Sequence, residues 1–562
     1  MILNKTVGAI IFLSLIVFVV NFYIYYFPVL NYGYAIGWFD ADDHSYSIKL
    51  LTSDPSLFFK SIFSPAKICN KYPTDSCRLI AASTNPPLFY LIGGALSFLP
   101  IKDVNVGYFT GTVLISFASI AVFILLYCAT KNLILSFISQ IFLGISIILL
   151  WTLQQGLYTA IIGTLFFPPT IYFFYRSLKD FKHKYFIISL TLLNLSASYY
   201  LIPFAISALI LLFFIALRDR RYVFKYFLDL VNFFKNKKIY LLLIILNTYF
   251  IFRIFFIFKT EFAKSLAGTP MGTLEAAAMV TYGGPLHALF YHLPNSFFPF
   301  LIFGIFLSCS MVVRFWYRLN LPSLKRIRET KFEKVDQLNL DEFTILFLYL
   351  VGISLTVFLP VLMAKYLPSF NFVNVFVADH VLKSINLLPQ LFVISFAFTF
   401  YYFIKKFNLS VGKQAIVYVI AIIILYLNYA WIVNPVDVVS NSSIKIKDYN
   451  YQLSVFMQRN PAMDDNKYAA MQFIRTQSAP SAKILIIHEQ YGFESFFFRD
   501  YKIVSDVNIT TGILDAEKYF ANYNYVVMLQ ETAIEGGLKK YFYDHGFQIV
   551  YHNPEILVMQ KT

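Results

Sequence analysis

Apolar runs long enough to cross a membrane recur along this chain and constrain its fold more than any other feature. An α-helix needs about 20 apolar residues to cross the roughly 30 Å hydrocarbon core of a bilayer. Runs of about this length occupy residues 7–28, 105–128, 133–151, 154–175, 239–258, 297–316, 343–364, 387–404 and 413–433. A longer run over 184–217 is interrupted by Ser196, Ser198 and Pro203, so we interpret it as two short spans. The pattern predicts an α-helical polytopic membrane protein with about eleven transmembrane helices.

The composition and the placement of charge support this interpretation. Hydrophobic residues make up 58% of the chain and charged residues only 14%, which is too apolar for a soluble protein of 562 residues. The net charge of +15 does not indicate a nucleic-acid partner, because the Lys and Arg residues cluster in short connectors, as cytoplasmic loops do. The basic connectors are Lys131, 176–184, 218–238, 314–334 and 405–413.

A cytoplasmic N-terminus places all these connectors in the cytoplasm, provided that residues 86–100 do not cross the membrane. That segment is short and begins with Pro86-Pro87, so we predict an interfacial or re-entrant helix. The regions then predicted to face outward are 29–104, 259–295, 365–386 and everything after about 434.

The composition changes after Pro435. The patterns "KILIIHEQ", "YNYVVML" and "ILVMQKT" predict strands, and "NKYAAMQFIRTQ" and "GGLKKYFYDHG" predict helices. We therefore predict a transmembrane module over residues 1–433, with juxtamembrane helices in the outer loop 29–104, and a small extracytoplasmic α/β domain over 434–562. Abundant Lys, Asn, Ile and Phe indicate an AT-rich bacterial genome, hence an inner-membrane protein with its outer loops facing the periplasm or the outside.

An acidic cluster follows the first apolar run, in "GWFDADDHSYSIKLLTSDP". Asp40, Asp42 and Asp43 crowd together at the mouth of a helical bundle, where like charges and low dielectric raise the pKa of a carboxyl group toward the range useful for proton transfer. The alternative is a solvated loop in which these residues cap an amphipathic helix that begins near His44, since Asp is a favoured N-cap.

The order of three short motifs resembles the N-terminal third of the GT-C glycosyltransferases. This family includes the protein O-mannosyltransferases and the lipid A aminoarabinose transferases. The motifs are "DDHSY" before an apolar helix, then "SDP", then "STNPPLFYLIGGALSFL". The resemblance continues along the whole chain as architecture, with about eleven spans and an outer C-terminal α/β domain.

The resemblance implies a general base at Asp42, with Asp43 beside it and Tyr46 completing the motif. In this family the base deprotonates an acceptor hydroxyl, which attacks the anomeric carbon of a polyprenyl-phosphate sugar with inversion. The implied partners are that lipid-linked donor, the bilayer and an extracytoplasmic acceptor, which is a glycolipid, a cell-surface polysaccharide or a protein. This chain departs from the family pattern before Pro86, where it has Asn85 in place of a basic or acidic residue.

A departing lipid phosphate calls for cations at the outer membrane surface. Arg253 in "TYFIFRIFFIFK" is the first candidate, and the alternative is a side chain that snorkels to the interface. Lys383 and His380 in "ADHVLKSINLLPQ" are two further candidates for binding the donor phosphate, and an interfacial lysine anchor explains this loop almost as well.

The remaining candidates for a substrate pocket are aromatic or histidine side chains near the outer surface. They join Asp40, His44 and Tyr46, and they are His287, His292, Tyr199 and Tyr200. Tyrosine stacks on sugar faces and donates a hydrogen bond, although an aromatic belt at the membrane interface is the better explanation for each tyrosine taken singly.

The chain shows no certain cofactor. Asp40, Asp42 and Asp43 supply hard oxygen ligands, which leaves a divalent metal ion open. Cys69 and Cys77 share the first outer loop, so a disulfide between them is also open.

Two other functions remain alternatives to a glycosyltransferase. A glycan polymerase or ligase would use a lipid-linked oligosaccharide at the same kind of site. A transporter of lipid-linked glycans would also need many spans, but such proteins usually carry internal repeats and charges near the bilayer midplane, and we find neither in this sequence.

Overall fold

The computed structural model describes most of the helical part of the chain and the strands of its C-terminal part. The described residues are 5–34, 41–56, 87–144, 146, 149, 152–153, 158–195, 200–236, 241–243, 245, 298–317, 340–366, 385–433, 465–479, 481–487, 503–507, 523–530 and 538–562.

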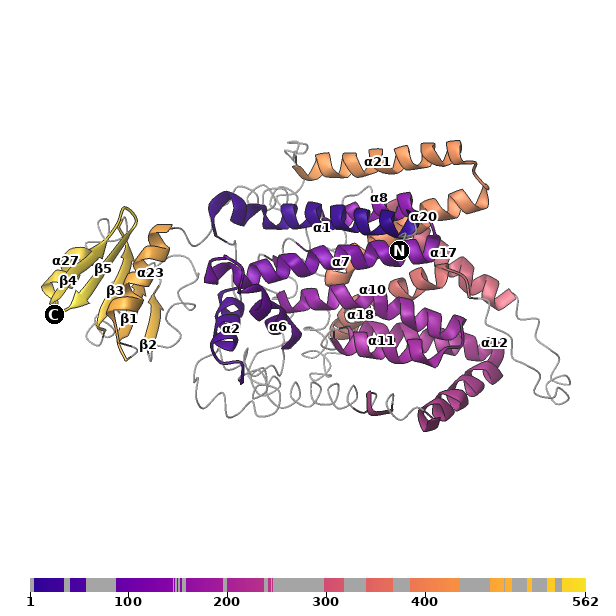
Figure 1. The fold of residues 1–562 in the computed structure, drawn as a ribbon, viewed down its shortest axis with the longest axis horizontal. Helices are drawn as coiled ribbons and strands as arrows, with labels where there is room; N and C mark the ends of the chain where they lie inside the picture. Colours follow the sequence, from indigo (N-terminus) through magenta and orange to yellow (C-terminus); the bar gives the residue numbers. More distant parts are fainter. Residues whose placement is uncertain are drawn as a thin grey trace. The chain divides into compact units, whose positions relative to one another are not determined.

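Helices make up nearly all of the described structure before residue 434 (Figure 1). The α-helices are α1 (Lys5–Tyr32), α2 (Ala41–Ser53), α6 (Pro87–Leu96), α7 (Val106–Thr130), α8 (Leu133–Gly144), α10 (Tyr158–Lys179), α11 (His183–Leu195), α12 (Leu201–Asn236), α17 (Phe298–Tyr317), α18 (Phe343–Tyr366), α20 (Leu388–Lys406) and α21 (Val411–Val433). Two 3₁₀ turns precede α7 and α20: η1 (Asp103–Asn105) and η4 (Ile385–Leu387).

These helices coincide with most of the apolar runs that predicted them. Within the described residues, three helical segments are both long and apolar enough to cross a membrane: Lys5–Phe27, Asp103–Thr130 and Leu388–Lys406. Shorter apolar helical segments cover Pro203–Leu217, Pro299–Ser310, Phe343–Thr356 and Val411–Leu427. An integral membrane protein follows from these segments, whereas the number of about eleven crossings stays a prediction.

Two predictions about individual helices can be compared with the structure. Helix α6 has 10 residues and is therefore about 15 Å long, about half of what a span requires, and the prediction that 86–100 does not cross stays a prediction. The basic connector predicted over 218–238 is largely helical, because α12 continues to Asn236 as one helix of 36 residues, and its cytoplasmic location stays a prediction. Tyrosine and phenylalanine at regular helical spacing after Arg221 allow that continuation.

The chain divides into two compact units. Unit 1 comprises Met1–Tyr25, Thr112–Thr152 and Thr159–Val455, and unit 2 comprises Tyr26–Gly111, Leu153–Tyr158 and Phe456–Thr562. The predicted boundary between residues 433 and 434 stays a prediction.

In unit 1, small residues and neutral hydrogen bonds join the helices. A Cβ atom on Gly163 of α10 would overlap the ring of Tyr200, and one on Gly352 of α18 would lie 2.5 Å from the carbonyl oxygen of Pro203 in α12. Gln390 of α20 donates from Nε2 to the carbonyl of Thr164 at 2.6 Å. Buried polar groups in a membrane bundle need such partners, because lipid supplies none.

In unit 2, the C-terminal part forms a five-stranded sheet in the order β2-β1-β3-β5-β4 (Figure 1). Its strands are β1 (Lys483–Ile487), β2 (Ile503–Val507), β3 (Tyr525–Leu529), β4 (Phe547–His552) and β5 (Ile556–Lys561). The first three strands pair in parallel, and β5 pairs antiparallel with both β3 and β4.

Two helices accompany this sheet: α23 (Asp465–Gln477) and α27 (Leu538–Asp544). Leu538 and Phe542 of α27 pack with Leu485 and Ile487 in one buried cluster. The intervening residue Ile486 is also buried, so both faces of β1 are covered, as expected for a central strand with a continuous apolar run. The predicted strands and helices of this part are therefore present, and β2 and β4 are additional.

Candidate functional site

The candidate site surrounds the first turn of α2 in unit 2. Asp42 and Asp43 are the second and third residues of this helix. The positive end of a helix dipole stabilises carboxylates at these positions. The backbone placement is described, whereas the side chains of these two residues lie outside the described part.

The residue after the acidic pair, His44, is buried in an aromatic cage. Its Nδ1 lies 3.1 Å from the hydroxyl of Tyr90 in α6. The imidazole packs against the rings of Phe89 and Tyr158, with centroids 5.4 Å away in both cases. The first turn of α2 is thereby attached to α6, the helix that follows the Pro-Pro motif.

A second set of contacts attaches α2 to the start of α7. Ser45 Oγ donates to the carbonyl of Val104 at 2.9 Å and accepts from the backbone N–H of Gly107 at 3.1 Å. A Cβ atom on Gly107 would lie 2.9 Å from this Oγ, so glycine allows the close approach. One turn further along α2, Lys49 forms an ion pair with Asp103 at 2.9 Å.

The ends of α1 and α7 also meet in unit 2. Gly33 ends α1 with a φ of +78°, a conformation that favours glycine. Its carbonyl accepts a hydrogen bond of 3.0 Å from Asn105 Nδ2 in η1. Tyr26 packs edge-on against Phe109, with ring centroids 5.3 Å apart. The first turn of α2 therefore stands where two apolar helices end.

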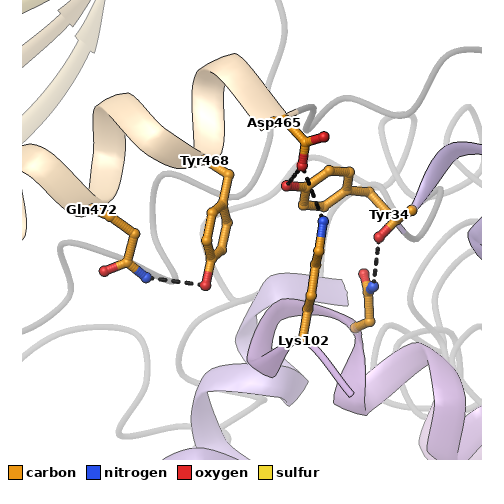
Figure 2. Close-up of polar contacts among 7 residues, drawn as sticks. Tyr34, Lys102, Asp465, Tyr468 and Gln472 are labelled. Atoms are coloured by element: carbon orange, nitrogen blue, oxygen red, sulfur yellow. Dashed lines mark hydrogen bonds and ion pairs between the residues drawn. The ribbon is translucent and has the colours of Figure 1, made fainter. Parts of the chain in front are cut away.

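A polar junction links this region to α23 (Figure 2). Tyr34 donates its hydroxyl to Asp465 Oδ1 at 2.5 Å, and Lys102 Nζ contacts the same oxygen at 3.1 Å. The ammonium group of Lys102 also lies 3.7 Å from the centroid of the Tyr34 ring. Tyr468, one turn after Asp465, accepts a hydrogen bond of 3.1 Å from Gln472. We call Tyr34, Lys102, Asp465 and Tyr468 the α23 junction.

The hydrogen bond from Tyr34, followed by the hydrogen bond and charge of Lys102, lowers the pKa of Asp465 below its usual value. The Asp465 side chain is 88% exposed, so water and salt screen this effect strongly. The junction is therefore an ionic contact at a solvated surface.

The structure brings together only some of the predicted site residues. His44 and Tyr46 are buried in α2, beside the backbone of Asp42 and Asp43. Asp40, Tyr199, Arg253, His287, His292, His380 and Lys383 lie outside the described residues, so their predicted roles stay predictions.

Tyr200 lies in unit 1, within the helix packing. Its ring covers Gly163, and its hydroxyl donates to the carbonyl of Ala160 at 3.1 Å. These contacts give Tyr200 a packing role in the bundle, and its predicted place in a sugar pocket stays a prediction.

Sequence reasoning missed the residues that hold α2 in place. Ser45, Tyr90 and Lys102 were not selected, although Ser45 and Tyr90 stand within the quoted motifs "DDHSY" and "NPPLFY". Asp465 was overlooked because its partners Tyr34 and Lys102 are more than 360 residues away.

No three His, Cys, Asp or Glu side chains gather into a metal site among the residues that the structure describes. The acidic side chains proposed as metal ligands are not among those residues, so a divalent ion stays open.

No family model and no curated protein match this chain. Among solved structures, it is similar to ArnT from Cupriavidus metallidurans, whose crystal structure contains bound undecaprenyl phosphate. The match covers 99% of this chain and 98% of ArnT, with 7% sequence identity and a TM-score of 0.43.

Proposed function

We propose that this protein is a membrane glycosyltransferase of the GT-C type, which moves a sugar from a polyprenyl phosphate to an extracytoplasmic acceptor with inversion. One observation supports this most: the acidic pair lies in the first turn of a helix that buried contacts attach to α6 and to the start of α7. A carboxylate so placed can meet a lipid-borne phosphate and a water-borne hydroxyl at the same membrane surface.

In this proposal Asp42 acts as general base. It takes the proton of the acceptor hydroxyl while the hydroxyl oxygen attacks the anomeric carbon from the face opposite the phosphate. The bond between the anomeric carbon and the phosphate oxygen breaks, and the polyprenyl phosphate leaves as an anion. Phosphate is already a competent leaving group, so the enzyme needs one base and cationic stabilisation of the departing charge.

The contacts of His44 and Ser45 support the precision that such a base needs. A catalytic group must be held within about 0.5 Å of its productive position, on a rigid element. His44 is bonded to α6 and Ser45 to the start of α7, which leaves the first turn of α2 little freedom. Arg253, His380 and Lys383 remain the proposed cations for the phosphate, and Asp43 the proposed partner of the base.

The test is the substitution Asp42→Asn, which keeps the shape and removes the base. We expect transfer to fall by at least about 100-fold, in the range of general-base catalysis, while the protein still reaches the membrane. Asp544→Asn on α27, where the side chain is exposed, is the matched control and should retain transfer. An Asp42→Asn protein with wild-type activity would contradict the assignment.

Mass spectrometry of lipid-linked sugars in a strain without the protein gives a second readout. Loss of a transferase leaves polyprenyl-phosphate monosaccharide unused, so this species should accumulate. Accumulation of a lipid-linked oligosaccharide would instead favour a polymerase, a ligase or a transporter.

A further inference from the structure

Helix α12 is much longer than its apolar part. The helix has 36 residues, of which Pro203–Leu217 are apolar, so residues 218–236 add about 28 Å beyond that part. We call residues 218–236 the α12 extension. Its sequence "RDRRYVFKYFLDLVNFFKN" carries five basic and two acidic residues.

One face of the α12 extension packs against the connection between α10 and α11. The hydroxyl of Tyr222 bonds the carbonyl of Leu178, and the ring of Tyr226 lies 4.8 Å from His183. Phe233 also contacts His183, with ring centroids 5.8 Å apart, although Phe233 lies about 10 Å further along the helix than Tyr226. The extension therefore crosses the end of α11, and Figure 1 shows the last part of α12 leaving the direction of its first part.

The opposite face of the α12 extension exposes large apolar side chains. Phe224 is 64% exposed and Val231 50%, and Phe227 and Leu228 lie between them on the same face. Their spacing of three and four residues forms one continuous stripe along a helix. No other described segment of unit 1 covers it.

This stripe continues a stripe of exposed residues on the apolar part of α12. Leu209, Phe213 and Leu217 are exposed at intervals of four residues, and Phe224 follows seven residues later, which keeps the same side of the helix. In a membrane-spanning helix, exposed leucine and phenylalanine face lipid. Continuity with that surface favours lipid over a water-soluble protein as the occupant of the extension.

Basic side chains border the stripe. Arg220, Arg221 and Lys235 are exposed, whereas Lys225 is half-buried and its ammonium group lies 5.9 Å from the centroid of the Phe181 ring, on the packed side. A helix that combines an apolar stripe with Lys and Arg is typical of helices that lie in the membrane interface and bind anionic lipids.

We propose that the exposed face of the α12 extension binds the anionic phospholipid surface of the membrane. Phe224, Phe227, Leu228 and Val231 insert at the boundary between headgroups and acyl chains. Arg220, Arg221 and Lys235 contact the lipid phosphates. This surface is separate from the acidic pair of α2 and does not depend on the proposed transferase activity.

The experiment uses the full chain in nanodiscs of phosphatidylcholine, with and without 30% phosphatidylglycerol, about one lipid in three. Amide hydrogen exchange of the α12 extension is measured in both membranes, and native mass spectrometry counts the retained phosphatidylglycerol. We expect amide hydrogen exchange of the α12 extension to be at least about 10-fold slower with the anionic lipid. Each basic residue near the surface contributes about a five-fold preference for an anionic over a neutral membrane.

The test variant is R220Q/R221Q/K235Q, which should lose both the slower exchange and the retained phosphatidylglycerol. The matched control removes three exposed lysines elsewhere, in K5Q/K406Q/K413Q, and should keep both. An unchanged melting temperature of each variant shows that packing on His183 persists. Equal exchange in the two membranes, or full retention of lipid by the test variant, overturns the proposal.

Discussion

The interior of unit 1 and the surroundings of α2 in unit 2 hold their helices together by different chemistry. Between the helices in the interior of unit 1 the contacts are neutral: Gln390 bonds Thr164, and Thr152 bonds Asn386 at 2.6 Å. The ion pairs of unit 1, such as Lys405 with Glu342 at 3.5 Å, lie at helix ends. In unit 2 the contacts include ion pairs, such as Lys49 with Asp103. An unpaired charge in lipid has a large unfavourable free energy. At a solvated surface, water and salt screen an ion pair, so that it contributes little to stability.

This difference between neutral and ionic contacts predicts which contacts are insensitive to pH and salt. The neutral contacts of unit 1 should depend little on pH and salt, because none of their partners titrates near neutrality. The α23 junction should respond to both. Steric changes in unit 1 should therefore have large effects, and changes of charge in unit 2 small ones.

The largest expected effect is that of Gly163→Val. The new side chain would overlap the buried Tyr200 ring, so α10 must move away from the start of α12. We expect a loss of about 3 kcal/mol or failure to fold, as for severe overpacking. Fluorescence-detected size-exclusion chromatography after heating measures it. Gly412→Val, where no atom lies within 4 Å, is the control and should keep the wild-type melting temperature.

The next effect is that of His44→Ala in unit 2. Removal of a buried ring leaves a cavity among Phe89, Tyr90 and Tyr158, at a cost of about 2 kcal/mol. His44→Phe fills most of the cavity and removes the hydrogen bond to Tyr90. His44→Phe should regain most of the stability that His44→Ala loses. If His44 positions the acidic pair, the transfer rate should nevertheless fall in both variants. Equal transfer rates for His44→Phe and the wild type would show that His44 packs the site and does not position the acidic pair.

A smaller effect is expected for Gln390→Leu in unit 1. The substitution removes the bond to the Thr164 carbonyl and one of 3.3 Å from Tyr349, and membrane-protein hydrogen bonds contribute about 0.6 kcal/mol each. We expect a loss of about 1 kcal/mol in thermal stability that is the same at low and high salt. A strong salt dependence would contradict the neutral character of this contact.

The smallest effect is that of Asp465→Asn at the α23 junction. Because the pKa of Asp465 is lowered in the folded chain, its stabilising contribution is present above the unfolded value of 3.8 and is lost as pH falls through the folded value. We expect faster amide hydrogen exchange in residues 465–477 for Asp465→Asn than for the wild type at pH 7. The wild type should show the same increase at acid pH, and also in 0.5 M salt, which is about three times physiological ionic strength. Asp544→Asn on α27 is the control, and its exchange should not change.

Local patterns in the sequence predicted those elements whose sequence is continuously apolar along the segment. The apolar runs located α1, α7 and α20, and "KILII", "YVVML" and "ILVMQ" located the central strands β1, β3 and β5. The edge strands β2 and β4 were missed, because "IVSDV" contains polar residues and β4 contains an irregularity between Ile549 and Tyr551. The α12 extension was missed because its basic residues resemble a cytoplasmic loop.

The candidate site was predicted as a location and not as a set of contacts. The motif "DDHSY" identified the first turn of α2, but nothing local indicates that His44 bonds Tyr90, 46 residues away. Long-range partners such as Tyr34 and Asp465 depend on the tertiary fold, which periodicity does not encode.

The strand order has a consequence for the synthesis of this protein. β5 is the last of the five strands to be made, yet it lies between β3 and β4, and it alone pairs with both. The hairpin partner β4 therefore cannot join the nascent β2-β1-β3 sheet until β5 has left the ribosome. Until then the unfinished edge of β3 is exposed to other chains, so an export or chaperone delay at this stage would favour aggregation.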